Sequence, residues 1–157
     1  MTATVLRAQF DRDCGDRRWF ELFQKCESAA PFEPASMSEL SECLLARCIN
    51  FEEIANSRRE NYLQLASCLP DLALFPELPA EVVPLGFPIR LVDRSRVRHS
   101  LFKAQIYPAV HWPLEGVVPK EFTESHQLSQ EIMTLPCDQR LRRDDIEYMV
   151  TRVRQAT

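Results

Sequence analysis

Glycine is scarce in this sequence: only Gly15, Gly86 and Gly116 occur among 157 residues. A loop that cradles a phosphate needs clustered glycines, because only an unhindered backbone brings its N–H groups close to the phosphate oxygens. Three isolated glycines therefore exclude a nucleotide-binding loop of that kind within this chain. Internal repeats and low-complexity segments are also absent.

Long apolar runs are missing as well. No segment approaches the roughly 18 consecutive apolar residues of a membrane-spanning helix. The first residues, MTATVLRAQFDRDCGDRRW, lack the apolar core of a signal peptide. The net charge is -4 with acidic and basic residues interspersed, so no basic surface for nucleic acid or an anionic membrane is indicated. We expect a cytoplasmic protein that binds neither membrane nor nucleic acid.

Cysteine is present, but without the spacing of a zinc knuckle. The six cysteines are Cys14, Cys26, Cys43, Cys48, Cys68 and Cys137. The closest pair, Cys43 and Cys48, is separated by four residues, whereas a knuckle has two. We expect reduced thiols, most of them buried as small apolar groups, and no metal site. The alternative is a zinc site that also uses His99, His111 or His126.

The composition, with 45% hydrophobic and 27% charged residues, suits one globular domain. Residues 1–69 are predicted to be helical. Ser36 and Glu39 have the spacing of a capping box, and Asn50 with Glu53 repeats it with asparagine as the cap. A shorter helix is expected after Asp16. It carries the large apolar side chains Trp19, Phe20 and Phe23.

A long helix is expected after Asn50, with one apolar side and one charged side. The apolar stripe consists of Phe51, Ile54, Ala55, Tyr62, Leu65, Ala66 and Leu69. Arg58, Arg59 and Glu60 lie on the opposite side, and we interpret them as a solvated face. Residues 70–84 contain four prolines and no helical period, which predicts an extended linker.

Residues 85–157 are predicted to form an α+β domain with a small, mostly antiparallel sheet and packed helices. The expected elements are a strand at 85–92, a basic helix at 94–104, a second strand from Ile106, a short helix at 128–132, a strand ending at Pro136 and a helix at 143–155. Pro88 places the first strand at an edge or a bulge, because proline lacks the N–H that a central strand needs.

The segment IYPAVHWPLEG, residues 106–116, is the most unusual stretch, since it is too rich in proline for a helix and too aromatic for an ordinary loop. It offers Tyr107, His111 and Trp112 as candidate ligand-binding side chains. Two other interpretations stay open. His111 bonds a backbone carbonyl while Trp112 fills the core, or Cys137 and His111 form a catalytic dyad near Asp138 and Arg140.

Four motifs in this order resemble the C-terminal part of the DegT/DnrJ/EryC1/StrS family of pyridoxal-phosphate (PLP)-dependent sugar aminotransferases of fold type I. They are SRRENYLQL (57–65), PLGFPIRLVDRSRVRHSLFKAQIYP (84–108), VHWPL (110–114) and LSQEIMTLPCDQRLRRDDIEYMV (128–150). The resemblance covers residues 36–155. It implies the small domain of such an enzyme, in which His111, Trp112 and Tyr107 face the substrate.

The chain also departs from the family pattern. Gln105 stands where the family has a helix-ending glycine, and Glu115 stands where it has a histidine. The large domain with the Schiff-base lysine is missing, and Lys25, Lys103 and Lys120 do not match its setting. The resemblance thus implies PLP only for a full-length relative and no cofactor or catalytic residue in this chain.

We accordingly expect a C-terminal domain or fragment that forms one wall of a substrate cleft and is not catalytic alone. The alternative is a standalone protein-interaction module derived from such a domain, and an independent enzyme based on Cys137 and His111 ranks third. A homodimer or higher homo-oligomer is expected, with much of the contact from helices within residues 16–68. Trp19 and Leu40 are two of the large apolar residues there.

Overall fold

The computed structural model describes residues 2–13, 16–30, 34, 36–111 and 113–157. The chain divides into two compact units, residues 1–48 and residues 49–157. The predicted division into a helical segment at 1–69, a linker at 70–84 and a domain at 85–157 stays a prediction. Among the described residues, no helix is long and apolar enough to cross a membrane.

The first unit consists of three helices, α1 (Thr2–Asp13), α2 (Arg18–Ser28) and α3 (Glu39–Arg47). Helices α1 and α2 contact each other through the rings of Phe10 and Trp19, whose centroids lie 5.9 Å apart. No described residue of the three helices is buried. The described residues of these helices therefore form no buried hydrophobic core.

Two of the predicted helix starts in this unit are wrong by one or two residues. Helix α3 is capped by Ser38, whose hydroxyl accepts from the Ser41 N–H, and not by Ser36. Helix α2 has Arg17 at its N-cap position. Asp16 still contributes, because its carboxylate accepts from the Arg18 N–H at 2.8 Å.

The second unit begins with the long helix α4 (Phe51–Cys68). Its predicted cap is confirmed: the Asn50 side chain accepts from the Glu53 N–H at 3.2 Å. Toward its C-terminal end, α4 buries Tyr62 and Leu65 in the core. The ring of Tyr62 meets that of Phe87 edge-on, with centroids 4.9 Å apart.

The sheet has two antiparallel strands, β1 (Gly86–Arg90) and β2 (Ile132–Pro136), with Pro88 opposite Thr134. Pro88 lies on an edge strand, as predicted, and its carbonyl accepts from the Leu74 N–H at 3.0 Å. Beyond β2, the predicted strand from Ile106 is reduced to one isolated bridge, between Ala109 and Thr134. That expectation was wrong because prolines on either side of Ala109 and Val110 interrupt a longer ladder.

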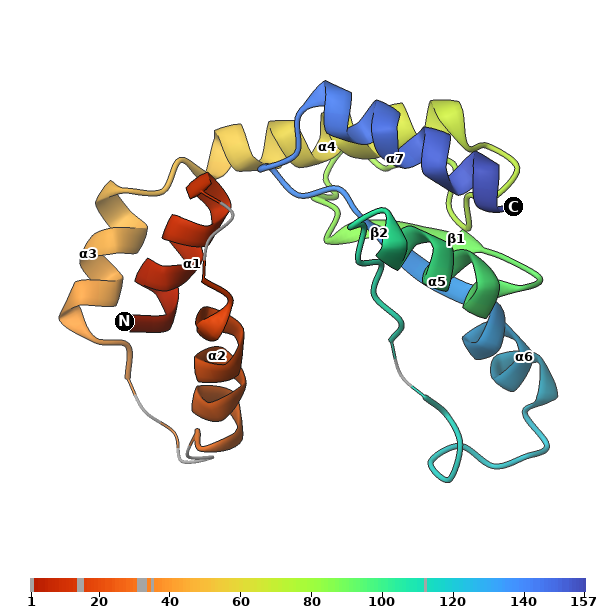
Figure 1. Ribbon diagram of the computed structural model, residues 1–157, viewed down its shortest axis with the longest axis horizontal. Helices are drawn as coiled ribbons and strands as arrows, with labels where there is room; N and C mark the ends of the chain where they lie inside the picture. Colours follow the sequence, from red (N-terminus) through yellow and green to blue (C-terminus); the bar gives the residue numbers. More distant parts are fainter. Residues whose placement is uncertain (1, 14–15, 31–33, 35, 112) are drawn as a thin grey trace. The chain divides into compact units, whose positions relative to one another are not determined.

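Three further helices complete the unit: α5 (Arg94–Lys103), α6 (Thr123–Glu131) and α7 (Arg143–Ala156). The second of these begins five residues earlier than the predicted 128–132. Figure 1 shows α4 and α7 running side by side, and both belong to the core that also contains β1, β2 and α5. The described part of the chain thus has seven helices and one two-stranded antiparallel sheet, which confirms the predicted α+β class.

Helix α5 ends in a Schellman motif built around Gln105, where the sequence departs from its family resemblance. The N–H of Ile106 donates to the Leu101 carbonyl at 2.9 Å, and the N–H of Gln105 donates to the Phe102 carbonyl at 3.1 Å. Gln105 has φ 61°, the left-handed conformation that glycine normally supplies here. Leu101 and Ile106 are both buried in the same core cluster, which agrees with the apolar pair typical of this motif.

Candidate functional site

The two faces of the sheet have different environments. Phe87, Ile89, Met133 and Leu135 are buried in the core, whereas the residues that alternate with them are partly buried, except for the exposed Arg90. The partly buried face forms the floor of an apolar cavity of about 450 Å³. Its lining includes Phe75, Leu85, Pro88, His111, Leu128 and Thr134. Such a volume and such a lining are typical of a small-molecule site.

A second cavity of about 540 Å³ adjoins the first, and we call it the mixed cavity because its lining is partly charged. Both cavities share Leu85, Gly86, His111 and Thr134. The lining of the mixed cavity further includes Arg58, Tyr107, Asp138, Gln139 and Arg140. An apolar floor with charged and hydroxyl groups at one side is suited to a ligand that is partly apolar and partly polar.

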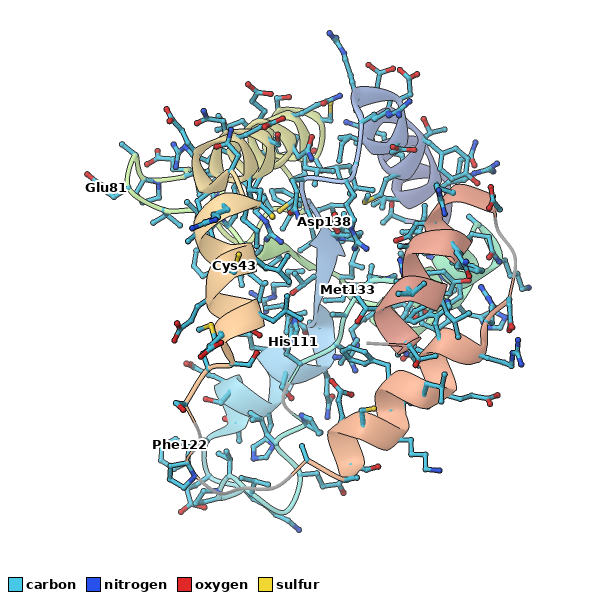
Figure 2. The ribbon with its side chains drawn as sticks, turned by 90° about the vertical axis from the view of Figure 1, so that its left-hand side faces the viewer. Cys43, Glu81, His111, Phe122, Met133 and Asp138 are labelled. Carbon is cyan, nitrogen blue, oxygen red and sulfur yellow. The ribbon has the colours of Figure 1, made fainter. Side chains whose placement is uncertain are left out.

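His111 and Tyr107 come together in the lining of the mixed cavity. Both residues are exposed, and the Tyr107 hydroxyl donates to the Gln105 Oε1 at 2.9 Å. In Figure 2, His111 lies in the loop near α6, and Asp138 lies by the arrowhead that marks the C-terminal end of β2. The third predicted side chain, Trp112, lies outside the described residues. Substrate binding by these three residues stays a prediction.

Cys137 does not suit the role of a nucleophile. The residue is fully buried, and burial raises the pKa of its thiol from 9.0 to about 11. A reactive cysteine needs the opposite environment, because the thiolate is the nucleophile. His111, by contrast, is exposed. The predicted alternative of a Cys137–His111 enzyme therefore loses its chemical basis.

Asp138 and Arg140 form a two-point ion pair at the rim of the mixed cavity. The Arg140 Nε and Nη2 donate to the two carboxylate oxygens of Asp138 at 2.9 and 3.1 Å. These hydrogen bonds hold the pKa of Asp138 below its usual range, and burial opposes the shift. Asp138 is therefore a carboxylate at neutral pH and suited to accept hydrogen bonds, not to act as a general acid.

The two arginines of α4 make hydrogen bonds that the sequence interpretation missed. Arg58 and Arg59 are not a solvated face. The Arg58 Nη1 donates to the carbonyls of Pro84 and Leu85 at 2.9 and 3.3 Å, and the Arg59 Nη1 donates to the Pro79 carbonyl at 2.8 Å. The four prolines of residues 70–84 were the available signal. A proline-rich segment has fewer N–H groups than carbonyls, so nearby arginines are needed as donors.

Asn61, one turn beyond Arg58, has a related role. It is buried, and its Nδ2 lies within hydrogen-bonding distance of the carbonyls of Cys137, Asp138 and Leu141. The shortest of these distances is 3.0 Å, to Asp138. The asparagine of the SRRENYLQL motif thus fixes the turn that follows β2 and that carries part of the mixed cavity.

The described residues do not fit PLP as a covalently held cofactor. A Schiff-base lysine has to be desolvated so that its pKa falls, but Lys25, Lys103 and Lys120 are all exposed. Lys120 lines a cavity of about 670 Å³ with His126, yet it remains at the surface. Among the described residues, no group of three or more histidine, cysteine or acidic side chains is placed to hold a metal ion.

Comparisons with known proteins find similarity in structure alone. No protein-family model and no curated protein sequence matches the chain. A DegT DnrJ EryC1 StrS aminotransferase from Brucella abortus superposes with a TM-score of 0.61 at 16% identity over 89% of this chain. The sugar aminotransferase CalS13 from Micromonospora echinospora superposes with a TM-score of 0.57 at 18% identity over 72% of this chain. For the aminotransferase TlmJ from Streptoalloteichus hindustanus, the TM-score is 0.59 at 22% identity over 67% of this chain.

The chain spans less than half of each of these structures: 44% of the Brucella abortus enzyme and 32% of each of the other two. Identities of this size establish the fold and nothing further. The chain therefore has the fold of a part of aminotransferases of the DegT/DnrJ/EryC1/StrS type, as its four sequence motifs predict.

Proposed function

We propose that this chain forms one wall of the substrate cleft of a PLP-dependent sugar aminotransferase-like protein and does not catalyse the reaction by itself. The single observation that carries the proposal is the place of His111, which lines both the apolar and the mixed cavity. The predicted ligand is a keto-sugar linked to a nucleotide. The lysine and the cofactor site would come from a part of the protein outside this chain.

The chemistry of the two cavities supports a sugar ligand. The apolar floor suits the C–H face of a hexose ring, and Thr134 and His111 are polar groups able to hydrogen-bond its hydroxyls. Tyr107 adds an aromatic ring, and Asp138 adds a carboxylate acceptor at the rim. Prolines at 108 and 113 stiffen the loop, so that little conformational entropy is lost on binding.

A titration followed by nuclear magnetic resonance tests the proposal. Thymidine diphosphate glucose serves as the probe, added to the labelled chain at millimolar concentration, because half of a cleft is expected to bind weakly. We expect shifts of the amide signals near His111, Leu85 and Thr134. His111→Ala should weaken binding about tenfold, while His99→Ala, at an exposed histidine on α5, should not change it. Equal effects of both substitutions would contradict the proposal.

The second candidate function is that of a protein-interaction module, and the first unit favours it. Phe20, Phe23 and Leu40 are each about half exposed, and no described residue of α1–α3 is buried. Such apolar surface is expected to be covered by another protein surface. We propose a homo-oligomer in which helices within residues 16–68 form much of the interface.

Light scattering on the purified chain tests this assembly. Phe20→Glu should dissociate the oligomer, because a carboxylate cannot be buried without a partner. Val92→Glu is the matched control, since Val92 is a fully exposed apolar residue of the second unit. Circular dichroism checks that both variants keep their helices. A monomeric wild-type chain at tens of micromolar would refute the assembly.

A further inference from the structure

Arg58 connects two segments that lie far apart in the sequence. Its Nη1 donates to the backbone carbonyls of Pro84 and Leu85, and its Nε donates to the Gln139 Oε1 at 3.1 Å. The first segment leads into β1, and the second follows β2. One guanidinium group thus spans from the beginning of one strand to the end of its antiparallel neighbour.

Both segments are walls of the mixed cavity. Leu85 and Gln139 line it, and so does Arg58 itself. Leu85 is 81% exposed, so side-chain packing contributes little to its position. The hydrogen bonds from Arg58 therefore act on the backbone at Leu85 together with the β1–β2 pairing, which begins at the next residue, Gly86. On the other wall, Asn61 fixes the backbone of the turn, and Arg58 fixes the side chain of Gln139.

We propose that Arg58 is a positioning residue that sets the separation of these two walls and thereby the affinity of the mixed cavity for its ligand. The inference rests on the proposed function, because it assumes that this cavity contributes to the nucleotide-sugar site. Arg58 itself need not touch the ligand. The planar guanidinium fork is required, since a lysine ammonium group cannot reach the carbonyls and the Gln139 amide in the same fixed geometry.

Arg59 provides a matched control on the same helix. Its Nη1 also donates to two backbone carbonyls, those of Pro79 and Val82. Neither residue is part of the lining of the apolar or the mixed cavity. Arg59→Lys should therefore lower thermal stability as Arg58→Lys does, without altering the cavity.

The test compares binding of thymidine diphosphate glucose by the full-length chain and its variants. Arg58→Lys should raise the dissociation constant about tenfold and shift the amide signal of Gly86, whereas Arg59→Lys should leave the constant unchanged. Gln139→Ala removes one contact at an exposed side chain and should weaken binding about threefold without a folding defect. This variant keeps the test decisive if Arg58→Lys does not fold.

The outcomes separate the two proposals. If the wild-type chain binds the probe and Arg58→Lys and Gln139→Ala bind equally well, the positioning role is wrong and the proposed function stands. Equal weakening by Arg58→Lys and Arg59→Lys would also refute the positioning role, because a general loss of stability would then explain both. If the wild-type chain shows no response at His111, the proposed function is wrong and the inference with it.

Discussion

Replacing Gln105 by glycine should stabilise the second unit. Gln105 has φ 61° at the end of α5, and a side chain in the left-handed region costs about 1–2 kcal/mol. Glycine avoids this cost but has more freedom in the unfolded chain, which offsets about 0.4–1 kcal/mol of the gain. The variant also loses the exposed hydrogen bond from the Tyr107 hydroxyl. The expected net stabilisation is about 0.5 kcal/mol.

Gln105→Ala separates the backbone effect from the loss of that hydrogen bond. Both variants lack the glutamine side chain, so their difference reports the cost of a Cβ at positive φ together with the greater freedom of unfolded glycine. Gln105→Gly should be more stable than Gln105→Ala by about 1 kcal/mol. Ala104→Gly, at a neighbouring position with φ -87°, should instead destabilise the chain by about 0.5–1 kcal/mol.

Urea unfolding followed by circular dichroism measures these differences, provided that the unfolding slopes of the variants agree. The interpretation would be refuted if Gln105→Ala were as stable as Gln105→Gly. It would also be refuted if Ala104→Gly and Gln105→Gly changed stability by the same amount and in the same direction.

Three further predictions concern the sheet, the buried thiol and the cofactor. Gly86→Ala should lower the free energy of unfolding in urea by about 1–3 kcal/mol, because the alanine Cβ would overlap the Thr134 methyl group and lie 3.1 Å from the Leu135 carbonyl oxygen. Unchanged stability would contradict this close approach. Folding raises the pKa of Cys137, so the contribution of its thiol to stability is present below pH 9 and is lost as the pH rises toward 11. Cys137→Ala should therefore lose less stability than the wild-type chain over that pH range, and equal losses would contradict the raised pKa. The chain mixed with PLP should show no Schiff-base absorbance after dialysis, because its lysines are exposed, and a persistent band would contradict this.

Local signals in the sequence predicted those elements whose stabilisation is itself local. Asn50 caps α4 as expected because the cap and its partner lie three residues apart in one turn. The prediction that Ser36 caps α3 was wrong because Ser38 also offers a hydroxyl, and the choice between the two depends on where the helix begins. The end of α5 could be placed before Ile106, where a strand was expected to begin. The positive φ of Gln105 could not be predicted, because residues other than glycine seldom adopt that conformation.

Long-range contacts were beyond the sequence patterns. Arg58 looked like part of a solvated face because its helix periodicity places it opposite the apolar stripe. Its carbonyl partners lie 26 and 27 residues away, in a segment without regular structure. The cavities were equally hidden, since they depend on how α6 and the described residues Tyr107, Ala109, His111 and Leu114 lie against one face of β1 and β2. His111 and Tyr107 were nevertheless identified as candidates from their unusual local composition.

The position of the bound probe is the most direct test of the cleft-wall proposal. Intermolecular nuclear Overhauser effects between the hexose protons of thymidine diphosphate glucose and protein methyl groups would report it. The proposal predicts contacts with the methyl groups of Leu85, Leu114 and Thr134, which line the apolar cavity, and none with Leu40 or Leu44 of α3. Contacts with α3 alone, or no contacts with the cavity methyl groups while the probe binds, would contradict the proposal.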